Sequence, residues 1–439
     1  MGPIERACLY ERRRCILGRM RGPGEDEDEA ALKEALDGLL RFGAMALRSG
    51  ATAFRVREWM GAIARGMRID SLAVHISLGA MTATARRGGA TTTLASEVAP
   101  IGINAWRIGA VEKLALAAGA GISPAGLRTR LDAMETVPPI HSLLTTALGV
   151  AAASGAFSYI NGGGPVEVVG SMVAGGIGQT LRSLMLRRHL NQYAVTAICA
   201  VLATSIFCLI LALIQAAGFP TPDHAAGFIS SALFLVPGFP LVAALLDMLQ
   251  NQINASLSRL AYGLGVLMAA AFGLSLVAAV AGLTVEPPPP LETSEAVTLL
   301  LRGVASFAGG CGFAVLYNSS WRTVLAVGCL AIVGNELRLA LHDAGMGLAP
   351  ATLFGAMTVG LLGSVVRPRL HEPRMALTVP GIIIMIPGTY AFQTIVMFNQ
   401  GDIQGALHAA VLNGFVVGAM AVGLAASRFI AERQWMVES

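Results

Sequence analysis

The chain has 439 residues and a formal net charge of +4, with 54% hydrophobic and only 13% charged residues. A soluble domain carries about 25% charged residues, so this composition excludes an ordinary soluble protein. Most of the charge lies in the first 140 residues, and the basic residues beyond them stand beside apolar segments. A nucleic-acid-binding protein instead groups basic residues on one domain, so we expect no nucleic-acid partner.

The N-terminal third predicts a disordered tail followed by a small domain. Residues 1–29 combine Arg12-Arg13-Arg14 with an acidic run and show no apolar period, which is typical of a disordered tail. In residues 30–137, helical spacing and strand-like runs predict a small α+β cytoplasmic domain. Its predicted helices are 36–47, 53–65, 104–118 and 124–135, and its predicted strands are 72–76, 81–85 and 91–94. Ser123 followed by Pro124 is typical of a helix start.

From His141 onward, apolar segments near the ~20 residues needed to cross a bilayer repeat along the chain. They predict a polytopic α-helical membrane protein, because lipid cannot satisfy the polar backbone of any other open structure. We count about ten transmembrane helices, at 141–160, 165–184, 193–217, 225–247, 257–282, 297–317, 322–341, 350–366, 376–398 and 405–427. They form two predicted five-helix units, at 141–282 and 297–427. An acidic, Pro-rich linker at 283–296 separates the units, and a cytoplasmic tail follows at 428–439.

Loop charges predict the orientation of these helices. The apolar run Cys15-Ile16-Leu17 is shorter than the ~7–15 residues of a signal-peptide core, so the N-terminus is expected to stay in the cytoplasm. Cytoplasmic positions then hold Arg182, Arg187, Arg188, Arg259, Arg322, Arg367, Arg369, Arg374, Arg428 and Arg433. The opposite positions hold acidic residues, with Arg338 as the exception. Excess arginine on one side indicates the cytoplasmic face, which places both termini in the cytoplasm.

The membrane part also repeats itself. Gly178-Gln179-Thr180-Leu181-Arg182 is similar to Gly334-Asn335-Glu336-Leu337-Arg338 at an offset of 156 residues, and Leu235-Val236-Pro237-Gly238 is similar to Met385-Ile386-Pro387-Gly388 at an offset of 150. Tyr159 and Asn161 are likewise paired with Tyr317 and Asn318. An odd number of spans in each half predicts that the second half enters the membrane upside down. Inverted repeats of this kind recur in secondary transporters.

Pro237-Gly238 and Pro387-Gly388 fall near the middle of the fourth and ninth predicted spans. Proline removes a backbone donor and glycine adds conformational freedom, so we predict that each motif breaks or kinks its helix at mid-membrane. A broken helix offers N–H groups and the positive end of a dipole to a substrate carboxylate. The alternative is a plain kink that serves packing. The matched positions favour all four residues as substrate-binding elements.

Other polar residues within the spans are further candidates. Buried carboxylates are costly in a membrane and are functional candidates by default, so Glu336, Glu167 and Asp247 are predicted proton-coupling residues, with Glu336 the deepest. For Glu167 and Asp247 the alternative is an ordinary position at the membrane interface. Asn161 and Asn335 are predicted to bind substrate, although each could simply hydrogen-bond a neighbouring helix.

No motif indicates a metal, a cofactor or an enzyme. The chain lacks a phosphate-binding G-x-x-x-x-G-K-[ST] loop, an H-E-x-x-H zinc motif and a G-x-S-x-G nucleophile motif. The six cysteines form no C-x-x-C pair, which argues against a metal or disulfide framework.

The chain resembles the threonine/serine exporter family. The resemblance begins with Leu40-Arg41-Phe42-Gly43, Arg48-Ser49-Gly50-Ala51 and Phe54-Arg55-Val56-Arg57-Glu58, and continues in Ile103-Asn104, Ile108 and Gly121-Ile122-Ser123. The two membrane halves, with Val236-Pro237-Gly238 and Ile386-Pro387-Gly388, are similar to the family's two five-span units, here fused in one chain. The resemblance implies proton-driven export of threonine and serine across a bacterial inner membrane.

The leading hypothesis is therefore a secondary transporter that exports small amino acids. Its partners would be the amino acid, protons and the lipid bilayer, with a homo-oligomer left open. The alternatives are a passive channel for small polar solutes and a membrane-anchored enzyme whose active site lies in residues 30–137. Only His75 and a hydroxyl-rich hairpin support the enzyme.

Overall fold

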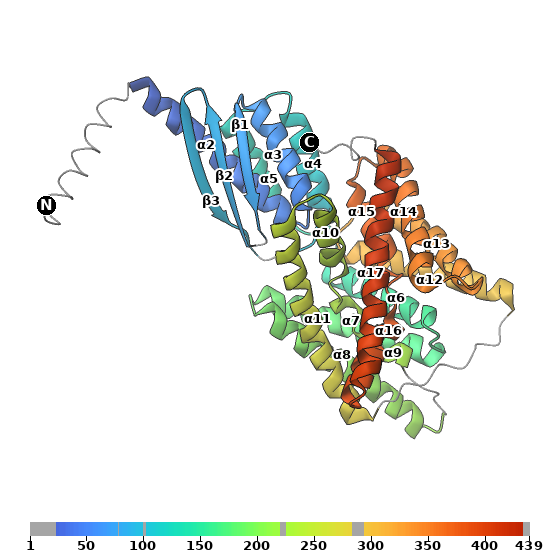
Figure 1. The fold of residues 1–439 in the computed structure, drawn as a ribbon. Helices are drawn as coiled ribbons and strands as arrows, with labels where there is room; N and C mark the ends of the chain where they lie inside the picture. Colours follow the sequence, from blue (N-terminus) through green and yellow to red (C-terminus); the bar gives the residue numbers. More distant parts are fainter. Residues whose placement is uncertain (1–22, 78, 100–101, 220–224, 283–293, 433–439) are drawn as a thin grey trace, which may run out of the picture. The chain divides into compact units, whose positions relative to one another are not determined.

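A computed structural model describes residues 23–77, 79–99, 102–219, 225–282 and 294–432. The chain divides into two compact units, one made of residues 1–101 and 110–137, the other of residues 102–109 and 138–439. The described part of both units is mainly helical (Figure 1).

The first unit packs helices against a small sheet. Strands β1 (Ser71–Ile76), β2 (Ala80–Arg87) and β3 (Ala90–Glu97) form an antiparallel sheet in that order. Helix α2 (Pro23–Arg48) packs on β2 and β3. Helices α3 (Ala53–Gly66), α4 (Ala105–Ala118) and α5 (Pro124–Glu135) follow in the chain. The core of the unit includes Leu36, Leu39, Phe42, Met60, Ile63 and Met81.

Local chemistry explains several of these elements. Arg87 pairs with Ala90 across a two-residue turn in which Gly88 has φ +57°, a conformation that glycine adopts at little cost. Ser123 accepts a hydrogen bond from the Gly126 N–H at 3.1 Å, so the predicted helix start is confirmed. Helix α2 begins at Pro23, within the predicted tail, because acidic residues suit the positive end of a helix. The rest of that tail lies outside the described residues.

The second unit contains the remaining helices. They are α6 (Leu143–Ile160), α7 (Pro165–Arg187), α8 (Gln192–Ala216), α9 (Ala225–Ser231), the 3-10 turn η1 (Leu233–Leu235), α10 (Gly238–Leu249), α11 (Ile253–Ala281), α12 (Glu295–Leu316), α13 (Trp321–Asp343), α14 (Leu348–Leu370), α15 (Arg374–Ile383), α16 (Gly388–Asn399) and α17 (Ile403–Ala431). Most of the linker predicted at 283–296 and the tail end beyond residue 432 lie outside the described residues.

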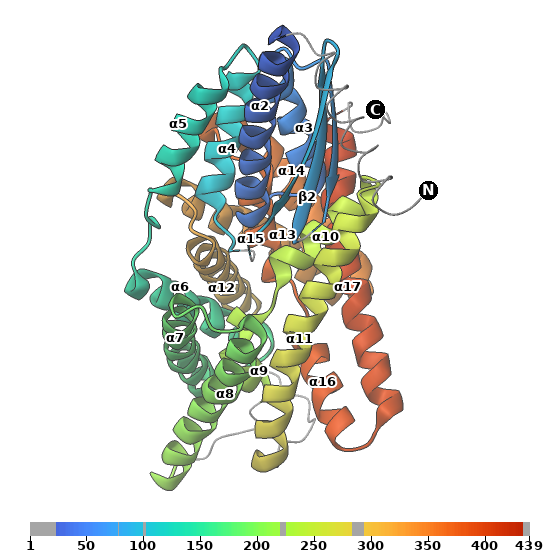
Figure 2. The same ribbon diagram turned by 90° about the vertical axis from the view of Figure 1, so that its left-hand side faces the viewer.

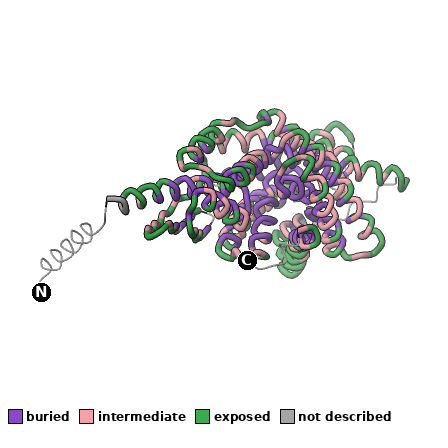
Figure 3. Tube along the Cα trace, turned by 90° about the horizontal axis from the view of Figure 1, so that it is seen from above, coloured by how far each residue is buried: buried purple, intermediate pink, exposed green. Residues whose placement is uncertain are grey.

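Seven helices in the described part of the chain are long and apolar enough to cross a membrane: α6, α8, α11, α12, α13, α14 and α17. Only 33–50% of the most apolar window of each is buried in the protein, and large apolar side chains such as Phe272, Leu276 and Phe415 are exposed. Buried stretches lie inside the helical packing and exposed ones around it (Figure 3). An outer surface this apolar suits lipid, so the chain is a polytopic α-helical membrane protein.

Helix bounds recur along the second unit at the two offsets found in the sequence. Helices α7 and α13 both have 23 residues and start 156 positions apart. Helices α10 and α16 both have 12 residues, and α11 and α17 both have 29, each pair starting 150 positions apart. The helix ends also agree, because Asn161 and Tyr317 are equivalent C-caps, and Gly162 and Asn318 after them both have positive φ. The cap geometry therefore pairs Asn161 with Tyr317, and the sequence-based pairing of Asn161 with Asn318 is one residue out of step.

Packing contacts recur at the same offsets. A Cβ on Gly273 of α11 would meet the Ala197 carbonyl, the Ala200 side chain and the Val201 nitrogen of α8. A Cβ on Gly423 of α17 would meet the carbonyl, side chain and nitrogen of Leu353, Ala356 and Met357, the counterparts in α14. Helices α8 and α11 pack together, as do α14 and α17 (Figure 2). Each pair therefore meets at an equivalent glycine.

Candidate functional site

The first predicted helix break is present between η1 and α10. Val236 is extended (φ −67°, ψ 120°), and the Gly238 N–H donates to the Val236 carbonyl at 2.8 Å. A Cβ on Gly238 would lie 3.3 Å from the side chains of Ile383 and Ile386. The first break therefore packs against the residues just before the second break, in the other half of the membrane unit.

The second predicted break lies between α15 and α16, around Pro387 (φ −80°, ψ 88°). A Cβ on Gly388 would lie 2.5 Å from the Phe157 ring and 3.4 Å from the Asn161 side-chain oxygen, both at the end of α6. The structure thus brings two predicted site residues, Asn161 and Gly388, together. It also covers both half-helix N-termini with apolar side chains, which leaves little room for a carboxylate in this conformation.

An arginine contacts the carbonyls just ahead of each break. The Arg182 side chain of α7 donates to the Phe234 carbonyl at 3.4 Å, and the Arg338 side chain of α13 donates to the Met385 carbonyl at 3.2 Å. Carbonyls at the C-terminal end of a helix segment carry partial negative charge, so a guanidinium suits both positions. Sequence reasoning used these arginines only as topology markers, although the repeat had already made them equivalent.

Asn335 orients Arg338 through a chain of hydrogen bonds. The Arg338 Nε donates to Asn335 Oδ1 at 2.9 Å, Asn335 Nδ2 donates to Ser306 Oγ at 2.9 Å, and Ser306 Oγ donates to the Arg302 carbonyl at 2.8 Å. Ser306 and Asn335 are fully buried, and Arg338 is 4% exposed. The predicted site residue Asn335 therefore acts on the neighbouring arginine in this conformation.

Glu167 joins two helix N-termini. Its carboxylate accepts a hydrogen bond from the Gly164 N–H at 2.9 Å, which completes a capping box on α7, and another from the Gly227 N–H of α9 at 3.1 Å. The geometry gives Glu167 a structural task at the start of the first broken segment.

Asp247 lies beside a buried arginine. Its carboxylate is 3.9 Å from Arg259 of α11, and the two side chains are 0% and 2% exposed. A buried charge needs a partner, so this pair accounts for the burial of both residues.

Glu336 differs from the other two predicted carboxylates. It is half-buried, and its Oε1 is enclosed without a hydrogen-bond partner among the described residues. The nearby Arg302 forms an ion pair with Asp343 at 2.6 Å. The structure therefore leaves Glu336 as the predicted carboxylate best suited to exchange a proton.

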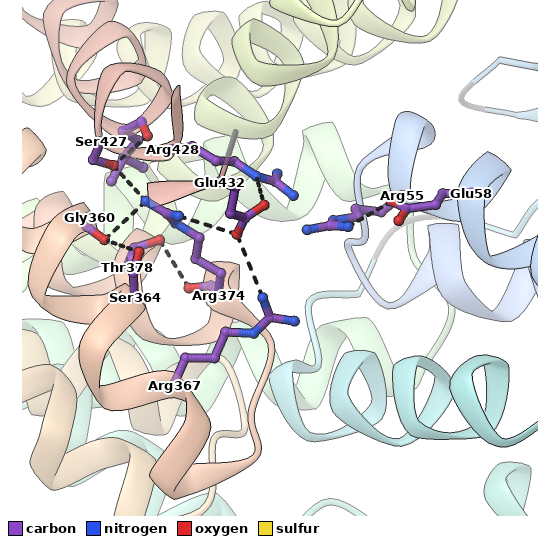
Figure 4. A network of polar contacts seen from close by, with 11 residues as sticks. Arg55, Glu58, Gly360, Ser364, Arg367, Arg374, Thr378, Ser427, Arg428 and Glu432 are labelled. Atoms are coloured by element: carbon purple, nitrogen blue, oxygen red, sulfur yellow. Dashed lines mark hydrogen bonds and ion pairs between the residues drawn. The ribbon is translucent and has the colours of Figure 1, made fainter. Parts of the chain in front are cut away.

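A charged cluster lies at the end of α17. The Glu432 carboxylate is 3.4 Å from Arg374, 2.9 Å from Arg428 and 3.7 Å from Arg367 (Figure 4). Arg374 also donates to the Ser427 hydroxyl at 2.7 Å and to the Gly360 carbonyl at 3.0 Å. The cluster joins α14, α15 and α17.

Metal ligands do not gather in the part of the chain that the structure describes, where no three His, Cys, Asp or Glu side chains could hold an ion. His75 lies exposed on β1.

Comparisons with known proteins agree over most of the chain. Residues 37–281 match the family described as "Putative threonine/serine exporter", and residues 302–430 match "Threonine/Serine exporter, ThrE". A relative from Escherichia coli named "Probable succinate transporter subunit YjjP" is 28% identical over 56% of this chain and 93% of that protein. A relative from Mycobacterium tuberculosis named "Probable threonine/serine exporter" is 22% identical over 88% of this chain and 74% of that protein.

No solved structure matches the chain. The two family matches follow one another along a single chain, so both units of the family are fused here. The chain belongs to the threonine/serine exporter family, a family of membrane transporters.

Proposed function

We propose that the chain is a secondary transporter that exports small carboxylate-bearing solutes, threonine and serine first, across a bacterial inner membrane. The observation that carries the proposal is the meeting of two broken helices, one from each half of a recurring helix arrangement. Transporters built from inverted repeats place their substrate site at such discontinuous helices.

An inverted arrangement of ten spans, with both termini in the cytoplasm, fits this proposal. Each half contains four continuous helices and one broken one. Helices α7 and α13, α10 and α16, and α11 and α17 have equal lengths, and the glycine crossing of α11 with α8 recurs between α17 and α14. Five spans per half turn the second half over in the membrane. Arg182 and Arg338 would then face opposite sides.

The names of the relatives give different substrates, and these substrates share a functional group. Threonine, serine and succinate all carry a carboxylate, so we propose a carboxylate as the common recognition element. The family is one of transporters, which argues against an enzyme in residues 30–137. A channel remains the competing mechanism.

The proton gradient is the proposed driving force, with Glu336 as the coupling residue. Its enclosed Oε1, which has no hydrogen-bond partner among the described residues, supports this role, because a carboxyl group inside a membrane helix is costly and indicates a functional position by default. Glu167 and Asp247 are weaker proposals, since backbone N–H groups and Arg259 already engage them.

The test is efflux from cells that lack their own exporters, loaded with labelled threonine, serine or succinate. We expect faster efflux of at least one solute in the presence of the protein, and loss of that gain when a protonophore is added. An efflux rate that the protonophore does not change would indicate a channel. Glu336→Gln should abolish most of the proton-dependent gain, whereas full coupling in that variant would remove Glu336 from the mechanism.

A further inference from the structure

Buried arginines in the described part of the chain are paired with acids at every position except one. Four arginines are buried there: Arg259, Arg338, Arg374 and Arg428. Asp247 lies 3.9 Å from Arg259, and Glu432 lies 3.4 Å from Arg374 and 2.9 Å from Arg428. Arg338 has no carboxylate within ion-pair distance among the described residues. A buried charge inside a membrane helix is costly and indicates a functional position by default.

The Arg338 guanidinium is oriented but incompletely used. Its Nε is fixed by Asn335, and its Nη1 donates to Met385, while Nη2 makes no hydrogen bond to a described residue. A guanidinium offers five donors in a planar fork that matches a carboxylate. The side chain is therefore held in place with part of its donor capacity left over.

We propose that Arg338 binds the carboxylate of the transported solute, with Asn335 as its positioning residue and Arg182 as the corresponding anion site of the first half. This inference rests on the proposed function and deepens it by naming the recognition group. A solute carboxylate would supply the counter-ion that the other buried arginines have from the protein itself. It would also compete with the Met385 carbonyl for Arg338, and so couple binding to movement of the second break.

The geometry favours the arginines over the half-helix N-termini. Gly238 and Gly388 are covered by Ile383, Ile386 and Phe157. The narrow space beside the first break, lined by Ser154, Phe234 and Phe313 among others, does not admit a water-sized sphere. Solute entry therefore requires the breaks to separate, and the carbonyls held by Arg182 and Arg338 lie at these breaks.

The experiment uses the full-length protein in liposomes and measures exchange of labelled serine, competed by unlabelled serine or by serinamide, which lacks the carboxylate. We expect the wild type to prefer serine. Arg338→Gln should reduce that preference by about 10- to 100-fold, the value of a charge-assisted hydrogen bond. Arg338→Lys should retain part of it. Arg322→Gln, which removes an exposed arginine from the start of the same helix, should leave the preference unchanged.

Asn335→Asp separates recognition from a purely structural role. The new carboxylate would pair with Arg338 inside the protein, so we expect unchanged or higher thermal stability together with weaker serine binding. An Arg338 that only supports the fold predicts unchanged serine binding in this variant, and that result would overturn the proposal even if Arg338→Gln does not fold. An unaltered preference for serine in folded Arg338→Gln would overturn it directly.

The two levels of the proposal fail in different ways. If the wild type moves neither serine, threonine nor succinate, the proposed function falls and the arginine assignment falls with it. If the wild type moves serine and the Arg338 and Asn335 variants keep the wild-type preference, only the assignment of Arg338 fails.

Discussion

The two halves of the membrane unit share a backbone plan but differ in where they place charge. The first half buries the pair Asp247–Arg259 between α10 and α11, and the residues 150 positions later are Met397 and Ala409. The second half gathers Arg374, Arg428 and Glu432 around Ser427, where the counterparts of Ser427 and Arg428 are Val277 and Ala278. The glycine crossing at Gly273 and Gly423 is therefore common to both halves, whereas each of these ion pairs belongs to one half alone.

This difference separates the contacts that build the shared helix packing from those that are particular to one half. The crossing at Gly273 and Gly423 recurs at a fixed offset, because a methyl group added there would meet backbone atoms of the partner helix. Charged groups can be exchanged for apolar ones of similar size without altering that geometry. Residues that are charged and also recur, namely Arg182 and Arg338, are thus the strongest candidates for function.

The largest expected effect concerns the ion pair of the first half. Asp247→Asn removes the partner of the buried Arg259, so we expect a loss of about 3–5 kcal/mol in stability, measured by thermal unfolding in detergent. The double variant Asp247→Met with Arg259→Ala installs the residues of the second half, and should recover most of that loss.

The same double variant also tests the proposed role of Asp247 in proton coupling. Full proton-dependent transport in a stable double variant would assign the pair to structure alone. Loss of coupling with retained stability would restore Asp247 as a coupling residue.

The glycine crossings give the next largest effect. Gly273→Ala and Gly423→Ala should each cost about 1–3 kcal/mol, the usual cost of overpacking, because the new methyl group meets a backbone carbonyl of the partner helix. A methyl group added to Gly414 or Gly418 on α17 would point into open space, with no other atom within 4 Å, so alanine there should be neutral or slightly stabilising. Equal costs at all four positions would contradict the shared crossing.

The sequence could predict the two helix breaks because proline and glycine act locally. The same motifs could not reveal what covers Gly238 and Gly388, since Ile383, Ile386 and Phe157 arrive through tertiary packing. The capping role of Glu167 was readable in principle, because Gly164-Pro165 followed by Glu167 at the third helical position is a typical helix start. Its second contact, with Gly227 sixty residues away, depends on the fold.

The equivalence of Arg182 and Arg338 was also visible in the sequence. Their partners, the carbonyls of Phe234 and Met385, could not be predicted, because every residue has a backbone carbonyl and residue type does not show which one accepts. The same reason hides the orienting role of Asn335, which depends on Ser306 of another helix.

The smallest expected effect tests whether packing volume can be moved between the halves. In the first half, Gly155 of α6 faces Met172 of α7, and the counterparts in α12 and α13 are Cys311 and Gly328. The glycine of this contact therefore lies on α6 in the first half and on α13 in the second, and the larger side chain lies on the opposite helix each time. Gly328→Met alone should be destabilised, because Cys311 and Phe307 already occupy that space. Adding Cys311→Gly should recover about 1 kcal/mol, a typical coupling for residues in contact.

A third change, Phe307→Ala, completes the transplant, since residue 307 corresponds to Ala151. The comparison predicts that the triple variant unfolds at a higher temperature than Gly328→Met. Additive losses across the three substitutions would mean that the two interfaces only share helix ends. Recovery would mean that the two interfaces share the same packing, and that the larger side chain of the contact can stand on either of the two helices.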